Sequence, residues 1–161
     1  MKYSNYIILF GLVFTTNISS AGPSAWDIAK ESYAGTKNIT VYRSSDCDCC
    51  KDWINHLKKH AFNIIDRPTN KLSAIKQKYG VPKNMASCHT ATIDGYVIEG
   101  HVPADDIKKL LKARPNITGL SVPKMPHGTP GMERGNRKDP FAVIQFNKSG
   151  KAELFKEYQS Y

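Results

Sequence analysis

The sequence predicts an α/β protein with one mixed sheet flanked by helices and a long, proline- and glycine-rich loop towards the C-terminus. Three observations favour this fold. A strand pattern, a helix pattern and a second strand pattern follow one another between residues 39 and 65. A hairpin pattern and a further helix occupy residues 91–113. The 161 residues are enough for one domain with its own hydrophobic core.

The composition is that of an ordinary globular protein. Of the residues, 40% are hydrophobic and 23% are charged, which excludes an intrinsically disordered chain. Only residues 6–14 form a strongly apolar run, so a protein that crosses the membrane several times is excluded as well.

The first 21 residues have the pattern of a secretory signal peptide. Lys2 precedes the apolar run 6–14, and Ser19-Ser20-Ala21 supplies small residues before a cut after Ala21. The alternative is an uncleaved anchor, but an anchor needs ~20 apolar residues. We therefore predict a signal peptide over 1–21, a leader segment over 22–38 and one domain over 39–161. No transmembrane segment remains after cleavage.

Export also changes how the basic charge is interpreted. The formal net charge is +9, from 23 Lys and Arg against 14 Asp and Glu. Nucleic acid is scarce outside the cytoplasm, so we predict no nucleic-acid partner. The pairs Lys58-Lys59 and Lys108-Lys109 lie on helical patterns, and we expect them on solvated faces.

The elements of the domain follow in order. The leader contains a short apolar group around Trp26, for which we expect one helical turn. Residues 39–42 predict a strand, and residues 48–60 predict a helix. The apolar stripe of this helix consists of Trp53, Ile54, Leu57 and Ala61. Residues 62–65 predict a second strand, which runs parallel to the first because a helix joins the two.

The second half of the domain adds a helix over residues 68–80, with Leu72, Ile75 and Tyr79 on one face. Residues 91–93 and 96–98 form a hairpin around Asp94-Gly95, a third helix begins at Pro103, and residues 141–146 are the last expected strand. This order matches the layout of thioredoxin and glutaredoxin, in which chemistry lies where the first strand meets the first helix.

Residues 114–140 fit no regular element. They contain five of the nine prolines and four of the eleven glycines, together with Met125, His127 and Met132. A loop of this length in a compact domain is usually functional or disordered. Its methionines either pack onto the domain as gap fillers or serve as metal ligands, and the sequence leaves both readings open.

The four cysteines carry most of the functional information: Cys47, Cys49, Cys50 and Cys88. Structural disulfides are the first interpretation, but three cysteines within four positions close almost no loop. Dithiol redox chemistry by Cys47 and Cys50 is the second, because C-x-x-C between a strand and a helix is its usual context. The additional thiol of Cys49 would then compete for the disulfide.

A site for a soft metal is the third interpretation. Clustered thiolates select Cu(I), Zn(II) or iron–sulfur centres. Zinc sites usually combine two C-x-x-C knuckles or cysteine and histidine pairs, and only one such knuckle is present. Cu(I) accepts two or three thiolates and also suits methionine and histidine. Within this third interpretation, Cu(I) is the metal that accounts for all the unusual features at once, and the dithiol interpretation remains open.

Two motifs resemble the glutaredoxin side of the thioredoxin superfamily. One is Cys47-x-x-Cys50, and the other is the segment from Cys88 to Gly95. In this alignment His89 stands where the superfamily has a cis-proline, and Cys88 is the residue before it. The resemblance implies that Cys88 lies against the C-x-x-C motif.

Nearly the whole exported part also resembles the CopG-like family of metal-binding, thioredoxin-like proteins, long catalogued as a domain of unknown function and associated with copper resistance. The resemblance is carried by Cys47-x-Cys49-Cys50-x-x-Trp53, Ser87-Cys88-His89-Thr90, residues 96–103 and residues 119–133. Where the family commonly has glycine, this chain has Asp48. The resemblance implies copper binding by the cysteine cluster in the periplasm of a Gram-negative bacterium.

The other histidines are weaker candidates. His56 and His60 have the i, i+4 spacing of a metal pair, but we expect two partly exposed helix residues. His101 is either a ligand or a packed polar residue. His89 is the best of them, as a ligand or as a proton partner of a thiolate.

The prediction is therefore a periplasmic protein that handles Cu(I) by sequestration, transfer or redox conversion. Its expected ligands are Cys47, Cys49, Cys50 and Cys88, with Met125, His127, Met132 and His89 as further candidates. The alternative is a thiol–disulfide oxidoreductase that uses Cys47 and Cys50 as its catalytic pair. A copper exporter or oxidase of the periplasm is the expected protein partner.

Overall fold

The computed structural model describes residues 24–161, so the predicted signal peptide over 1–21 lies outside the described residues. Residues 24–161 contain twelve elements. They are η1 (Ala25–Asp27), β1 (Asn38–Arg43), α1 (Asp48–Lys59), β2 (Asn63–Pro68), α2 (Leu72–Lys78), η2 (Lys83–Met85), β3 (His89–Ile93), β4 (Tyr96–Glu99), α3 (Ala104–Ala113), β5 (Gly119–Ser121), β6 (Phe141–Phe146) and β7 (Ala152–Tyr158).

The strands form one mixed sheet in the order β2-β1-β3-β4-β5-β6-β7. β1 and β2 are parallel, as are β4 and β5, while the other neighbours are antiparallel. The predicted α/β fold with a mixed sheet is thus confirmed, and the arrangement is compatible with the thioredoxin-like layout. None of the helices within residues 24–161 is long and apolar enough to cross a bilayer.

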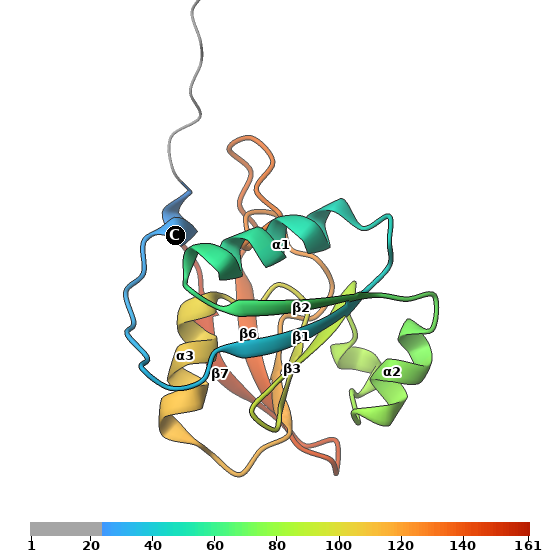
Figure 1. Cartoon of the computed structure of the whole chain (residues 1–161). Coiled ribbons are helices and arrows are strands. Elements are labelled where there is room, and N and C mark those ends of the chain that lie inside the picture. Colours follow the sequence, from blue (N-terminus) through green and yellow to red (C-terminus); the bar gives the residue numbers. More distant parts are fainter. Residues whose placement is uncertain (1–23) are drawn as a thin grey trace, which may run out of the picture.

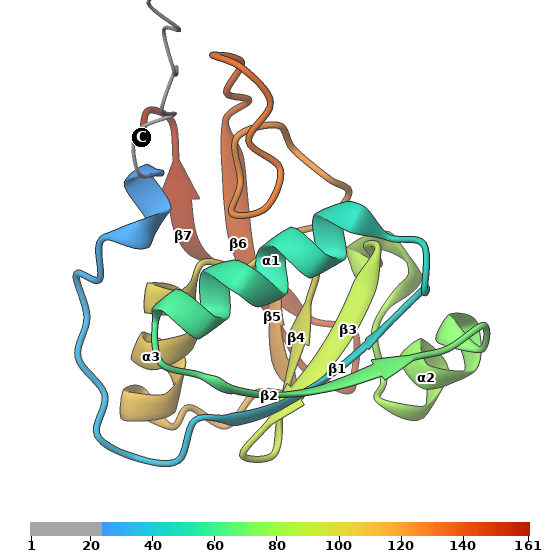
Figure 2. The same ribbon diagram turned by 45° about the horizontal axis from the view of Figure 1, so that its top comes forward.

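The helices lie on both faces of the sheet (Figures 1 and 2). α1 buries Trp53, Ile54 and Leu57, three members of its predicted stripe, and α3 lies beside it. Side chains alternate along a strand, so Thr90 on β3 and Glu99 on β4 share one face. That face is the one covered by α2, because Lys76 of α2 contacts both of these residues.

Two strands differ from the prediction. β5 lies inside residues 114–140, where no regular element was expected, and its three residues are all buried. β7 follows β6, so residues 141–146 are not the last strand. Residues 122–140 remain a loop that passes beside α1 (Figure 2).

The leader is fixed to the domain by contacts of η1 and of the side chain of Trp26. η1 supplies the expected helical turn, and the ring of Trp26 lies 5.1–6.1 Å from the rings of Phe141, Tyr158 and Tyr161. The C-terminus consequently lies next to η1 (Figure 1). The indole of Trp26 also donates a hydrogen bond to the carbonyl of Gly128 at 2.7 Å, which ties the leader to the long loop.

Candidate metal centre

The four cysteines meet at one edge of the sheet. Cys47 caps the N-terminus of α1 after β1 has ended, and Cys88 directly precedes β3. Because β1 and β3 pair antiparallel with Arg43 opposite His89, the end of one strand lies beside the start of the other. The four Sγ atoms all lie within 4.8 Å of one another. Cys88 therefore lies against the C-x-x-C motif, as the resemblance to the thioredoxin superfamily implied.

The cluster holds one disulfide and two thiols. Cys47 is bonded to Cys50, while Cys49 and Cys88 are free and partly exposed. The sulfur of Cys49 lies 3.5 Å from that of Cys47. A thiolate this close to a disulfide is placed for exchange, and reduction of the bond would release a four-thiol site.

The environment of Cys88 favours the protonated thiol when no cation is bound. Burial, followed by the nearby thiol of Cys49, raises the pKa of Cys88 to about 12. A bound cation reverses this balance, since a coordinating thiol loses its proton outright. Metal binding at Cys88 would therefore release a proton at neutral pH.

Two imidazoles extend the cluster. Nδ1 of His89 and Nε2 of His101 lie 3.2 Å and 3.1 Å from the sulfur of Cys88. Nδ1 of His101 lies 2.8 Å from the carbonyl oxygen of Pro130, so it carries the proton, and the lone pair of Nε2 faces the sulfur. Nε2 of His89 is buried and has no hydrogen-bond partner among residues 24–161.

Both imidazoles are held in the neutral form that binds metals. Burial lowers the pKa of His101 to about 4. Burial, followed by the proximity of the imidazole of His101, lowers the pKa of His89 well below its ordinary value. Sequence reasoning ranked His89 as a candidate but did not include His101 in the predicted ligand set. The only signal for His101 was its position directly after the hairpin, two residues beyond β4.

The long loop covers the first turn of α1. A Cβ on Gly131 would lie 2.5 Å from the backbone nitrogen of Trp53 and 2.9 Å from the carbonyl oxygen of Cys49. Pro130, its neighbour, is the residue that accepts the hydrogen bond of His101. The loop is thus part of the wall around the cluster.

The three candidate ligands in this loop have different surroundings. Met132 directly follows Gly131 and is partly buried. Met125 is 49% exposed. Nδ1 of His127 pairs with the carboxylate of Asp139 at 3.0 Å, outside the cysteine and histidine clusters. The roles of all three as ligands stay predictions.

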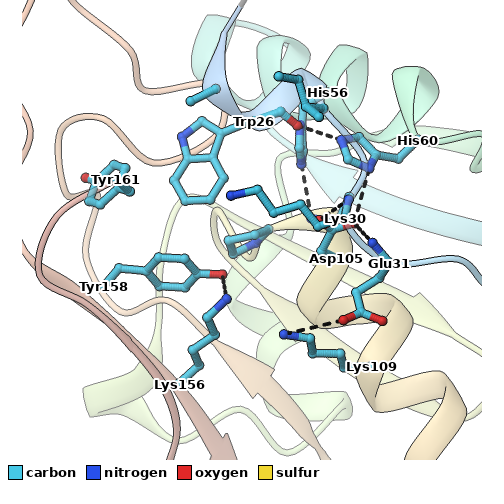
Figure 3. A pocket seen from close by; sticks show the side chains of 14 residues that line it. Trp26, Lys30, Glu31, His56, His60, Asp105, Lys109, Lys156, Tyr158 and Tyr161 are labelled. Atoms are coloured by element: carbon cyan, nitrogen blue, oxygen red, sulfur yellow. Dashed lines mark hydrogen bonds and ion pairs between the residues drawn. The ribbon is translucent and has the colours of Figure 1, made fainter.

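We expected His56 and His60 to be partly exposed, but both are buried. His60 donates through Nε2 to the carbonyl of Trp26 at 2.6 Å, and its Nδ1 lies 3.1 Å from Nζ of Lys108. Figure 3 shows His60 close to the backbone of Trp26 and to the side chain of Asp105. Lys108 is only 3% exposed, which corrects the expected solvated face. The backbone carbonyls of Trp26 and Glu31 in the leader accept hydrogen bonds from His60 and Lys108, which water would otherwise accept.

A cavity of about 110 Å³ lies beside these residues (Figure 3). Its wall includes the rings of Trp26, Tyr158 and Tyr161. The hydroxyl of Tyr158 donates to Asp106, and that of Tyr161 lies within hydrogen-bond distance of the carbonyls of His127 and Asp139. The hydroxyls of Tyr158 and Tyr161 therefore already have hydrogen-bond partners within the protein.

Comparison with known proteins gives two kinds of similarity. A family model described as a protein of unknown function, DUF411, matches residues 85–132, which include Cys88 and His101 but not the cysteines of α1. No curated protein matches the chain. Two solved structures match, described as copper resistance protein CopG in Form 1 and Form 2.

The similarity to both structures spans the domain. Form 1 is 46% identical with a TM-score of 0.74, and the match covers 78% of this chain and 100% of that chain. Form 2 is 47% identical with the same TM-score, and the match covers 77% and 99%.

Proposed function

Since this chain belongs to the CopG-like family of copper resistance proteins, we propose that it binds copper as Cu(I) at the cluster of Cys47, Cys49, Cys50 and Cys88. The observation that carries the proposal is the convergence of four sulfur atoms within 4.8 Å of one another. Thiolates are soft ligands and favour Cu(I). The neutral imidazoles of His89 and His101 add borderline nitrogen ligands beside Cys88, the cysteine that both groups share.

The disulfide makes copper binding dependent on the redox state. Reduction of the Cys47–Cys50 bond consumes two electrons and two protons and yields two thiols. Two Cu(I) ions release two electrons when they become Cu(II), so the two reactions balance in either direction. We propose that sequestration, transfer or redox conversion of copper takes place through this pair.

Anaerobic titration of the reduced protein with Cu(I) against a competing chelator tests this proposal. We expect at least one Cu(I) per chain, and Cys88→Ser or Cys49→Ser should weaken binding or lower the stoichiometry. Asp106→Asn is the matched control, because this carboxylate is buried on α3 outside the cluster. Unchanged affinity and stoichiometry in Cys88→Ser would refute the four-thiol site.

A thiol–disulfide oxidoreductase is the second candidate, supported by the bond between Cys47 and Cys50 at the start of α1. It requires reduction of a protein disulfide such as that of insulin in the absence of metal. No reduction of insulin by the fully reduced protein would eliminate this candidate.

Location in the periplasm is also part of the proposal. It rests on the signal-peptide pattern of residues 1–21. The mass of the protein recovered from a periplasmic extract should correspond to a chain that begins at Gly22. A full-length mass, or recovery from the cytoplasm alone, would contradict export.

A further inference from the structure

A buried ion pair lies directly behind Cys88. Glu99, at the end of β4, is fully buried, and its Oε1 accepts from Nζ of Lys76 at 2.5 Å. The same oxygen accepts from the backbone N–H of Ser87 at 2.6 Å. Its other oxygen accepts from the hydroxyl of Thr90 at 2.7 Å. One carboxylate therefore binds residues on both sides of Cys88 and His89.

These contacts join three separate parts of the chain. Lys76 comes from α2, Glu99 from β4, and Ser87 and Thr90 from the segment that carries Cys88. Nζ of Lys76 also lies 3.0 Å from the hydroxyl of Thr90, so the three side chains form one network. The network lies on the face of the sheet opposite His89, because adjacent residues of a strand point to opposite faces.

We propose that the Lys76–Glu99 pair is a positioning device that holds the backbone of residues 87–90 so that Cys88 faces the other cysteines and His89 faces the sulfur of Cys88. The inference rests on the proposed copper site and deepens it, because Glu99 and Lys76 are not themselves ligands. Groups that orient metal ligands from behind commonly change metal affinity 10- to 100-fold when they are removed.

Packing next to Glu99 supports the same role. Gly100 has φ +71°, and a Cβ there would lie 2.6 Å from both the hydroxyl of Ser87 and the carbonyl of Val122. The N–H of Gly100 donates to the carbonyl of His89 at 3.1 Å. The segment that carries Cys88 is therefore held on both sides by the residues around position 99.

Two variants of the pair keep the test independent of folding. Glu99→Ala removes all three hydrogen bonds and leaves Lys76 without its partner. Lys76→Met combined with Glu99→Met removes both charges and keeps the volume, an exchange that is often neutral for stability. Asp106→Asn is the control, because Asp106 is another buried carboxylate that accepts from a hydroxyl, that of Tyr158 at 2.6 Å.

The first measurement is the Cu(I) affinity of the reduced proteins. We expect both variants to bind Cu(I) at least about tenfold more weakly than the wild type, whereas Asp106→Asn should bind as the wild type does. In a Cys88→Ser background the further loss caused by Glu99→Ala should disappear. An equal loss with and without Cys88 would show a general structural role and overturn the inference.

The second measurement needs no metal. In the Cys49→Ser protein with the Cys47–Cys50 disulfide intact, Cys88 is the remaining free thiol. We expect alkylation of Cys88 by iodoacetamide to become at least about tenfold faster in both variants of the pair, because the loosened segment exposes the sulfur, and unchanged in Asp106→Asn. Unchanged alkylation in the variants would overturn the positioning role. If the wild type binds no Cu(I), the proposed function fails while this measurement still decides the inference.

Discussion

Replacement of Gly131 by alanine tests the close approach of the long loop to α1. Gly131 has φ +81°, and an added Cβ would lie 2.5 Å from the backbone nitrogen of Trp53. It would also lie 2.9 Å from the carbonyl oxygen of Cys49. Both obstacles are backbone atoms of the helix that carries the cysteines, so neither can rotate away.

The expected cost has two parts. The left-handed backbone costs an L-residue about 1–2 kcal/mol, and insertion of a methyl group into a packed contact costs about 1–3 kcal/mol. Gly150 separates them, because its φ is +83° and nothing lies within 4 Å of its added Cβ. We expect Gly150→Ala to lose about 1–2 kcal/mol of unfolding free energy and Gly131→Ala about 2–5 kcal/mol.

Urea unfolding of the metal-free proteins, followed by tryptophan fluorescence, measures both losses. The Cu(I) affinity of Gly131→Ala should also fall, since the loop moves away from the first turn of α1, while that of Gly150→Ala should not. Equal losses of stability in the two variants would refute the close approach of Gly131 to α1.

Two further predictions concern the buried groups beneath the leader. Burial, with the charge of His60, lowers the pKa of His56 to about 3, so the unfolded chain binds one more proton than the folded chain between that value and about pH 6.5. Stability should therefore fall as the pH decreases through this window, by about 1.4 kcal/mol per pH unit more than in His56→Gln, and equal slopes would exclude His56 as the cause. Lys108→Met removes the hydrogen bond from Nζ to the carbonyl of Glu31 at 2.9 Å. Trypsin should then cut after Lys30 severalfold faster than in the wild type, and an unchanged rate would show that Lys108 does not hold the leader.

The sequence predicted the parts of the fold that have strong local patterns. Residues 39–42, the stripe of Trp53 and Leu57 and the Asp94-Gly95 turn each specify their element without help from distant residues. β5 was missed because it has only three residues, too few for a visible alternation, and lies in a segment rich in proline. β7 was missed because three of its seven residues are charged, Glu153, Lys156 and Glu157, and because it lies at the edge of the sheet.

The part of the candidate site that lies in sequence motifs, the four cysteines, could be predicted. The resemblance to the thioredoxin superfamily implied that Cys88 lies against the C-x-x-C motif, and in the structure its sulfur lies within 4.8 Å of the other three. His101 was not included, because its approach to Cys88 depends on the carbonyl of Pro130, 29 residues further along the chain. The burial of His60 likewise depends on the backbone of Trp26, 34 residues earlier, which no helical period can reveal.

The anchoring of the leader has a consequence for the order in which the protein assembles. Its contacts reach far along the chain, from Ser24 to Glu133 over 109 residues and from Lys30 to Asp105 over 75. The leader is synthesised before α3 and the long loop, because the ribosome makes the N-terminal part first. The residues that the leader contacts therefore become available only later. Trp26 cannot be fully covered until the last strand and Tyr161 are available, because its ring packs against Phe141, Tyr158 and Tyr161.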